Sequence, residues 1–218
     1  MFHYKNAVGN LDNIKIEINY SMRQHILPVH EVTIDSDYLA APLTVATLAP
    51  IELFGGKIKA LTERAAARDL YDVYNMIHER IFDESEMDLL RKCVLFYRAV
   101  GSTGAFQEDI NLDGIDEITF QMIRQTLIPV LRKDKRFDFE EAKDEVMSYV
   151  SELLVPTENE WAFLRNFAKG DYIPELLFED EAILNRIIDH PMARWKCERI
   201  KQTQSQKREQ SQGMKMTM

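Results

Sequence analysis

The stretch PIELFGGKIKALTERAAARDLYDVYNMI, residues 50–77, decides the fold, because a helical apolar pattern and an unusual polar pattern coincide in it. Its first half carries an apolar stripe at helical spacing, which predicts a helix with one buried face. The stripe consists of Ile51, Phe54, Ile58 and Leu61. Pro50 suits the first position of a helix, so we expect the helix to begin there.

A second helix is predicted after Ala65-Ala66-Ala67, where a new apolar stripe begins at the same spacing. The stripe consists of Leu70, Val73, Tyr74 and Ile77. The two predicted helices therefore follow each other with a short break between them.

Both predicted helices also carry charged side chains on faces other than the apolar stripes. Lys57 and Arg64 are about two helical turns apart, so both lie on a second face of the first helix. Asp69 and Asp72 flank the second stripe, with Arg68 beside them. Ordinary structural roles are available to all five: Asp69 as an N-cap or first-turn residue, Asp72 as an i,i+4 partner of Arg68, and the cations as a solvated face.

Taken together, these residues resemble the AbiEii/AbiGii toxin nucleotidyltransferases. A block of that family has a helix carrying K-x-x-A-L-x-x-R, a short gap, and then R-D-x-x-D. Here the first part runs from Lys57 to Arg64 and the second from Arg68 to Asp72, with every polar position filled at the expected spacing. The resemblance is strong over about residues 11–77 and only compositional beyond them.

The resemblance implies a role for each of these side chains. Lys57 would contact a nucleotide phosphate or help to activate the acceptor, and Asp72 would be a catalytic or positioning carboxylate. Arg64 and Arg68 would contact phosphate, for which the guanidinium fork is well suited. Asp69 would orient the pair. The family would use an NTP as substrate with Mg²⁺ as cofactor, would modify tRNA, another RNA or a protein, and would pair with a cognate antitoxin.

The start of the chain is predicted to be β-structure, which makes the fold class α+β: a partial nucleotidyltransferase-type sheet followed by a mainly helical domain. Ile14, Ile16 and Ile18 alternate with polar residues, as in a half-buried strand, and residues 2–8 could pair with it as a hairpin. Further strands are predicted at residues 29–34 and 43–48. Glu17 lies on the polar face of the first strand, where a carboxylate is usually solvated. The family resemblance instead suggests that it is a metal ligand.

Beyond residue 77 the apolar pattern is helical, with segments predicted at about residues 85–99, 118–127, 137–154, 157–169, 180–189 and 191–200. Glu160 follows Thr157 by three residues, the spacing of a capping box at the start of a helix. The aromatic residues of these segments fall at core spacing and are interpreted as packing rather than as base-stacking surfaces. The polar tail 201–218 has too few apolar residues to offset the entropy of ordering, so disorder is predicted there. The predicted organisation is residues 1–80 as part of a nucleotidyltransferase-like domain, 81–200 as a helical domain, and the tail.

The composition is that of one soluble globular unit of 218 residues, 45% hydrophobic and 29% charged. Its formal net charge of −9 argues against a broad nucleic-acid surface. The only two cysteines, Cys93 and Cys197, provide no disulfide framework and no metal-ligand spacing. We find no leader segment and no apolar run long enough to span a membrane, so a cytoplasmic protein is expected.

One part of the family pattern is not found in this sequence. Nucleotidyltransferases of this fold resemble one another in an earlier motif, Gly-Ser or Gly-Gly-Thr followed by D-x-D on the next strand, whose aspartates hold the divalent metal. Neither 101–104 nor 35–37 fits that motif, so the chain resembles the family without its N-terminal third. Two functions are therefore expected as alternatives: a nucleotidyltransferase-like toxin that is inactive as this fragment, or a non-catalytic module that contacts an antitoxin-like partner.

Overall fold

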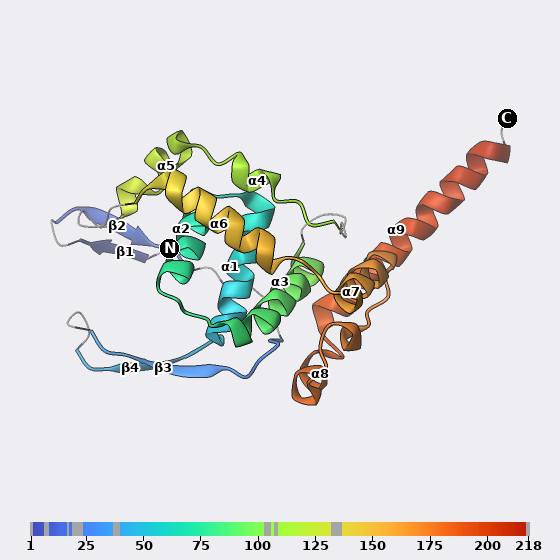
Figure 1. Cartoon of the computed structure of the whole chain (residues 1–218), viewed down its shortest axis with the longest axis horizontal. Coiled ribbons are helices and arrows are strands. Elements are labelled where there is room, and N and C mark those ends of the chain that lie inside the picture. The colour runs from blue at the N-terminus through green and yellow to red at the C-terminus, as the bar shows by residue number, and fades with distance from the viewer. Residues whose placement is uncertain are drawn as a thin grey trace.

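A computed structural model describes residues 2–6, 9–16, 18, 24–36, 40–102, 106, 109–131 and 137–216, with side chains as far as residue 206. Two β-hairpins precede a helical body (Figure 1). β1 (Phe2–Lys5) pairs antiparallel with β2 (Leu11–Ile14), and β3 (His30–Ile34) pairs antiparallel with β4 (Leu43–Thr47). The predicted α+β class is confirmed. The expected single partial sheet is instead two separate two-stranded sheets among the described residues.

The strand predicted around Ile14, Ile16 and Ile18 differs from the structure. β2 ends at Ile14, while Ile16 and Ile18 lie outside any strand and are 65% and 68% exposed. The prediction of a half-buried strand is therefore wrong for these residues. Alternation shows only which side chains share a face, whereas burial requires a second layer, and the described residues place none over this face.

The helical body contains the predicted helices. Its α-helices are α1 (Pro50–Arg64), α2 (Ala67–His78), α3 (Met87–Gly101), α4 (Asp113–Asp116), α5 (Phe120–Thr126), α6 (Phe139–Leu153), α7 (Glu158–Lys169), α8 (Glu181–Ile187) and α9 (Pro191–Met216). Short 3-10 helices lie at η1 (Glu84–Glu86), η2 (Ile128–Val130) and η3 (Pro174–Leu176). The described part of the chain has no helix that is both long and apolar enough to cross a membrane.

Helix ends follow local chemistry that the sequence carries. At the start of α7, Thr157 accepts a hydrogen bond from the Glu160 N–H while the Glu160 carboxylate accepts one from the Thr157 N–H, which is the capping box the sequence predicts. α7 ends at Gly170, whose φ of 91° is a left-handed conformation that glycine adopts without strain.

The core consists of two clusters of buried side chains that meet at α3. The first joins α1 and α2 to α3, α5 and α6, with Ile58, Leu70 and Val146 at its centre. The second joins α3 to α7, α8 and α9 through residues such as Phe96 and Phe163. Both sides of residue 80 contribute to the first cluster, so a division of the chain near residue 80 remains a proposal.

α1, the helix that carries Lys57, packs closely against α3 at Gly55. A Cβ built on Gly55 would lie 2.7 Å from the Cβ of Cys93 on α3. Glycine at this position therefore allows the two backbones to approach. α1 is held from one side by α3 and from its C-terminal end by α2.

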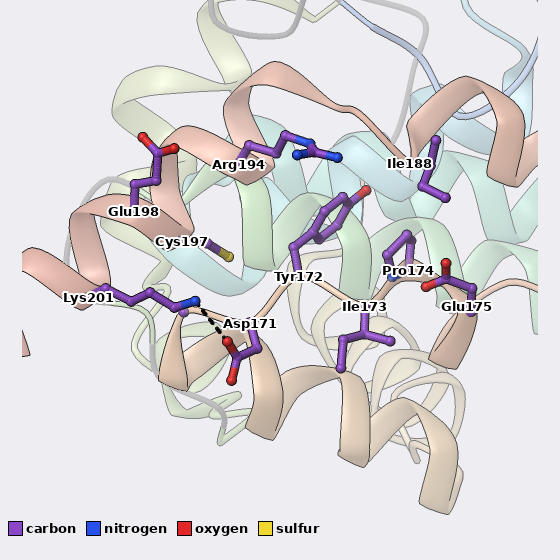
Figure 2. Close-up of a pocket in the computed structure, with 11 residues that line it drawn as sticks. Asp171, Tyr172, Ile173, Pro174, Glu175, Ile188, Arg194, Cys197, Glu198 and Lys201 are labelled. Atoms are coloured by element: carbon purple, nitrogen blue, oxygen red, sulfur yellow. Dashed lines mark ion pairs between the residues drawn. The ribbon is translucent and has the colours of Figure 1, made fainter.

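α9 packs with its first turns on the body and then extends away from it (Figure 1). A groove of about 490 Å³ lies where α9 meets the segment after α7 (Figure 2). In this groove, Lys201 Nζ lies 2.9 Å from the Asp171 carboxylate. The helix continues to Met216, whereas the sequence predicted disorder after residue 200. Packing of Ala193 and Cys197 nucleates the helix, and adding further turns, of which residues 201–206 are exposed, costs little once a nucleus exists.

Candidate functional site

The break between α1 and α2 brings charged side chains of the two helices together within the segment 57–72. α1 ends at Ala65, which adopts a left-handed φ of 46° and donates its N–H to the Leu61 carbonyl. Ala66 is extended, and α2 begins at Ala67 without a side-chain cap. This reversal turns the start of α2 back toward α1, so that residues of the two helices can pair.

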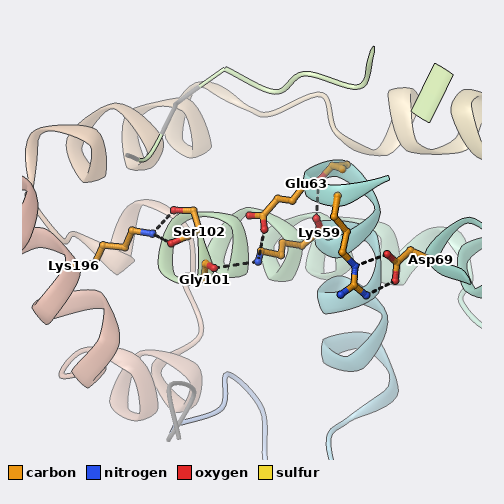
Figure 3. A network of polar contacts seen from close by, with 8 residues as sticks. Lys59, Glu63, Asp69, Gly101, Ser102 and Lys196 are labelled. Carbon is orange, nitrogen blue, oxygen red and sulfur yellow. Dashed lines mark hydrogen bonds and ion pairs between the residues drawn. The ribbon is translucent and has the colours of Figure 1, made fainter. Parts of the chain in front are cut away.

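Asp69 and Arg64 form a two-bond ion pair across this break. Arg64 Nε lies 2.6 Å from Asp69 Oδ2, and Nη2 lies 2.7 Å from Oδ1 (Figure 3). The Asp69 side chain is only 3% exposed, while that of Arg64 is 67% exposed. The hydrogen bond from Arg64 to Asp69 and the attraction between the two charges raise the pKa of Arg64. Asp69 is thus a buried first-turn residue of α2 that orients Arg64, rather than an N-cap.

Lys57 and Asp72 form a second pair between the same helices. Lys57 Nζ lies 2.6 Å from Asp72 Oδ2, and the two side chains are 40% and 36% exposed. The i,i+4 pair of Asp72 with Arg68 is not formed; Arg68 is exposed and makes no ion pair with the described residues. Because the Lys57 pair faces solvent, an incoming anion can compete with Asp72 for the ammonium group.

A pocket of about 670 Å³ lies beside this block, with a size in the usual range for small-molecule sites. The α1 residues Lys57, Lys59 and Arg64 supply its cationic wall. Leu48 and Leu53 add apolar surface, and residues from the end of α3 and from α9 complete the lining. The structure therefore places Lys57 and Arg64 in the lining of one pocket, each paired with an aspartate, Asp72 or Asp69.

Glu52 is a residue of this pocket that the sequence interpretation missed. Its side chain is fully buried, and its two oxygens accept the backbone N–H groups of Ile26 and Leu27, each at 3.0 Å. The Tyr97 hydroxyl donates a third hydrogen bond, and burial together with that bond raises the pKa of Tyr97. Glu52 thereby ties the segment before β3 to α1. The sequence signal that was overlooked is an acid between Ile51 and Leu53, in a first turn that is otherwise apolar.

The described residues do not fit a divalent metal. No group of three or more His, Cys, Asp or Glu in the described part of the chain could hold one. The carboxylates nearest the pocket are engaged elsewhere: Glu52 with backbone N–H groups, Asp69 with Arg64, and Asp72 with Lys57. Glu17, the residue that the resemblance suggests as a metal ligand, lies outside the described residues.

Comparison with known protein families shows to which family the chain belongs. Residues 1–165 match the family described as nucleotidyl transferase AbiEii toxin, type IV TA system. The chain belongs to the AbiEii toxin family. The match includes both hairpins, the whole of residues 57–72 and the helices through most of α7, and thus confirms the resemblance seen in the polar block. Searches of curated proteins and of solved structures found no match.

Membership in the AbiEii family gives a general expectation of the chemistry of the chain. The family is one of nucleotidyltransferase toxins, for which an NTP substrate, a divalent metal and an antitoxin partner are the general expectation. The α9 helix and the end of α7 lie beyond the matched residues. The part of the pocket lining that α9 supplies is therefore not covered by the family match.

Proposed function

We propose that this chain is the nucleotidyltransferase-like toxin component of an abortive-infection or toxin–antitoxin system, acting in phage defence. The reaction proposed is transfer of NMP from an NTP to an RNA, such as tRNA, or to a protein acceptor. One observation carries the proposal: Lys57 and Arg64 line the same pocket in a chain of the AbiEii family. Two cations on one wall suit a polyphosphate, which an ammonium group binds as a point charge and a guanidinium group binds through two hydrogen bonds.

The proposed roles follow from exposure and pairing. A phosphate entering the pocket exchanges with Asp72 as the partner of Lys57, because both side chains reach solvent. Asp72, so released, is proposed to position the acceptor or to take up its proton. Asp69 is a positioning residue, since its carboxylate fixes the Arg64 fork from behind. Arg68 is exposed next to this site and is proposed to contact phosphate of a longer acceptor.

We further propose that the 218-residue chain by itself transfers little or no nucleotide. Its sequence contains no Gly-Ser or Gly-Gly-Thr turn followed by D-x-D on a strand. In this fold those aspartates hold the Mg²⁺ that screens the charge of the triphosphate. Glu17 stays a proposed metal ligand. Binding of nucleotide through Lys57 and Arg64 is expected to persist, since ion pairing with phosphate does not itself require the metal.

The test is equilibrium binding of a labelled NTP to the wild-type chain and three variants. Lys57→Ala should raise the Kd roughly 10-fold or more, the loss expected for a hydrogen bond to a charged group. Asp72→Ala should leave binding unchanged or tighten it, because it removes the competing anion. Lys92→Ala is the matched control, since Lys92 forms a similar pair with Asp88 at 2.7 Å outside this pocket. Equal Kd values for Lys57→Ala and Lys92→Ala would refute the proposal.

The alternative is a non-catalytic module that binds an antitoxin-like partner. The exposed apolar side chains of the hairpins favour it, because Phe2, Leu11 and Leu43 are 62%, 74% and 51% exposed. In that case the chain binds no nucleotide in the assay above but forms a stable complex with its cognate antitoxin. Such a complex would then be weakened by Leu11→Lys and left intact by Lys57→Ala.

A further inference from the structure

The wall of the pocket that α9 supplies contains an exposed tryptophan. Trp195 and Met192, both on α9, line the pocket together with Lys57 and Arg64 of α1. Trp195 is 54% exposed, although a tryptophan is usually highly buried. Its helix also buries Ala193 and Cys197, so α9 turns a different face toward the pocket. The interpretation of the helix aromatics as packing is therefore not supported for Trp195.

Two lysines hold this wall in place. Lys196, the residue next to Trp195, is buried and donates to the carbonyl and hydroxyl oxygens of Ser102 at the end of α3 (Figure 3). Lys59 on α1 donates to the Gly101 carbonyl at 3.2 Å and pairs with Glu63 at 2.6 Å. The C-terminal carbonyls of a helix have no partner inside the helix, so they are natural acceptors for such cations. α9 and α1 are thus both anchored to adjacent residues at the C-terminus of α3.

Contacts of His190 also hold the start of α9. His190, fully buried, accepts the Ala193 N–H at its Nδ1 at 3.3 Å and contacts the Gln24 carbonyl through Nε2 at 3.1 Å. These contacts define the ring as neutral with the proton on Nε2. These hydrogen bonds hold the backbone on both sides of Trp195, while the Trp195 side chain stays accessible.

The chemistry of the two walls is complementary in a specific way. One wall offers cations for phosphate, and the other offers an aromatic surface with an adjacent thioether. Arg199 lies over the Trp195 ring, 5.7 Å from its centroid, and supports one face of the indole. A nucleotide has the matching pair of groups: a phosphate chain and a flat base that stacks on aromatic side chains.

We propose that Trp195 is the stacking surface for a nucleobase whose phosphates contact Lys57 and Arg64. The inference rests on the proposed function and extends it to a residue outside the family match. The base belongs to a nucleotide, either the NTP or the terminal nucleotide of an RNA acceptor. Stacking of this kind tolerates any base, so it provides affinity rather than strong base selection.

Fluorescence provides a direct test, because the chain has two tryptophans and the second, Trp161, is on α7 against the core. In the Trp161→Phe variant, Trp195 is the sole indole. Titration with each NTP should quench its emission in a saturable manner. A single-stranded RNA oligonucleotide with a free 3′-hydroxyl group is titrated in parallel; quenching by the RNA alone would assign the base to the acceptor and still support the proposal.

Binding measured by calorimetry separates this inference from the proposed function. Trp195→Ala should weaken nucleotide binding about 5- to 150-fold, as expected for the loss of one stacked base, while Trp195→Phe should retain most of the affinity. Inorganic tripolyphosphate, which has no base, should bind Trp195→Ala as it binds wild type. If Trp195→Ala leaves nucleotide affinity unchanged while Lys57→Ala weakens it, the stacking inference fails and the proposed function stands. If neither nucleotide nor tripolyphosphate binding depends on Lys57, both fail.

Discussion

Replacing Arg64 with alanine should destabilise the protein much more than replacing Lys57, although both are pocket cations on the same helix. The Arg64 replacement leaves the Asp69 carboxylate, 3% exposed, without its two charge-assisted hydrogen bonds of 2.6 and 2.7 Å. Removing one partner of a buried pair costs about 3–5 kcal/mol. Arg64 itself is 67% exposed, so water partly replaces it, and the N-terminus of α2 favours the remaining charge. The expected loss is therefore about 1.5–3 kcal/mol.

Lys57→Ala provides the comparison. Its pair with Asp72 has both members more than a third exposed, and such pairs contribute about 0–1 kcal/mol. Urea denaturation followed by far-UV circular dichroism measures both free energies of unfolding. A double-mutant cycle completes the experiment: Arg64→Ala should cost little when Asp69 is already alanine, because no buried charge is then left unpaired.

The result that would refute this reasoning is an Arg64→Ala variant no less stable than Lys57→Ala, or a cost that persists in the Asp69→Ala background. The outcome also governs how activity data are read. Loss of function in the Arg64→Ala variant can result from unfolding, since Arg64 stabilises the buried Asp69 carboxylate. Loss of function at unchanged stability in Lys57→Ala reports on the site itself.

The remaining predictions concern packing and thiol chemistry. Gly55→Ala places a Cβ 2.7 Å from the Cβ of Cys93, and overpacking of about 1–3 kcal/mol should outweigh the helix-propensity gain of up to about 1 kcal/mol. Gly56→Ala meets nothing within 4 Å and should raise the melting temperature; equal behaviour of the two variants would contradict the close approach of α1 and α3. Both thiols should react slowly with Ellman's reagent at about pH 8, because burial raises the pKa of Cys93 and raises the pKa of Cys197 to about 11. Cys197 then has roughly 100-fold less thiolate than a thiol of ordinary pKa, and labelling as fast as in urea would overturn this expectation.

The sequence by itself predicted most of the helices, some of their ends, and the family, but not the extent of α9. Apolar residues at helical spacing predicted α1 and α2, and the Thr157 to Glu160 spacing predicted the capping box of α7, because both signals are local and act within one turn of chain. The polar block from Lys57 to Asp72 was sufficient to indicate a family that the comparison confirmed. The sequence also predicted β1, β3 and β4 near their observed bounds.

Only the tertiary structure decided which charges pair and which side chains face the pocket. Spacing alone allowed Asp72 to pair with Arg68, one turn along the same helix, whereas the reversal at Ala65 brings it to Lys57 on the preceding helix. The burial of Glu52 depends on the segment at Ile26, which folds over α1 from a distant point in the sequence. Trp195 has the spacing of a core residue and yet is exposed in the pocket, because the packing of α9 on α3 sets the rotation of the helix about its axis. Periodicity defines the faces of a helix, while contacts between distant segments decide what each face meets.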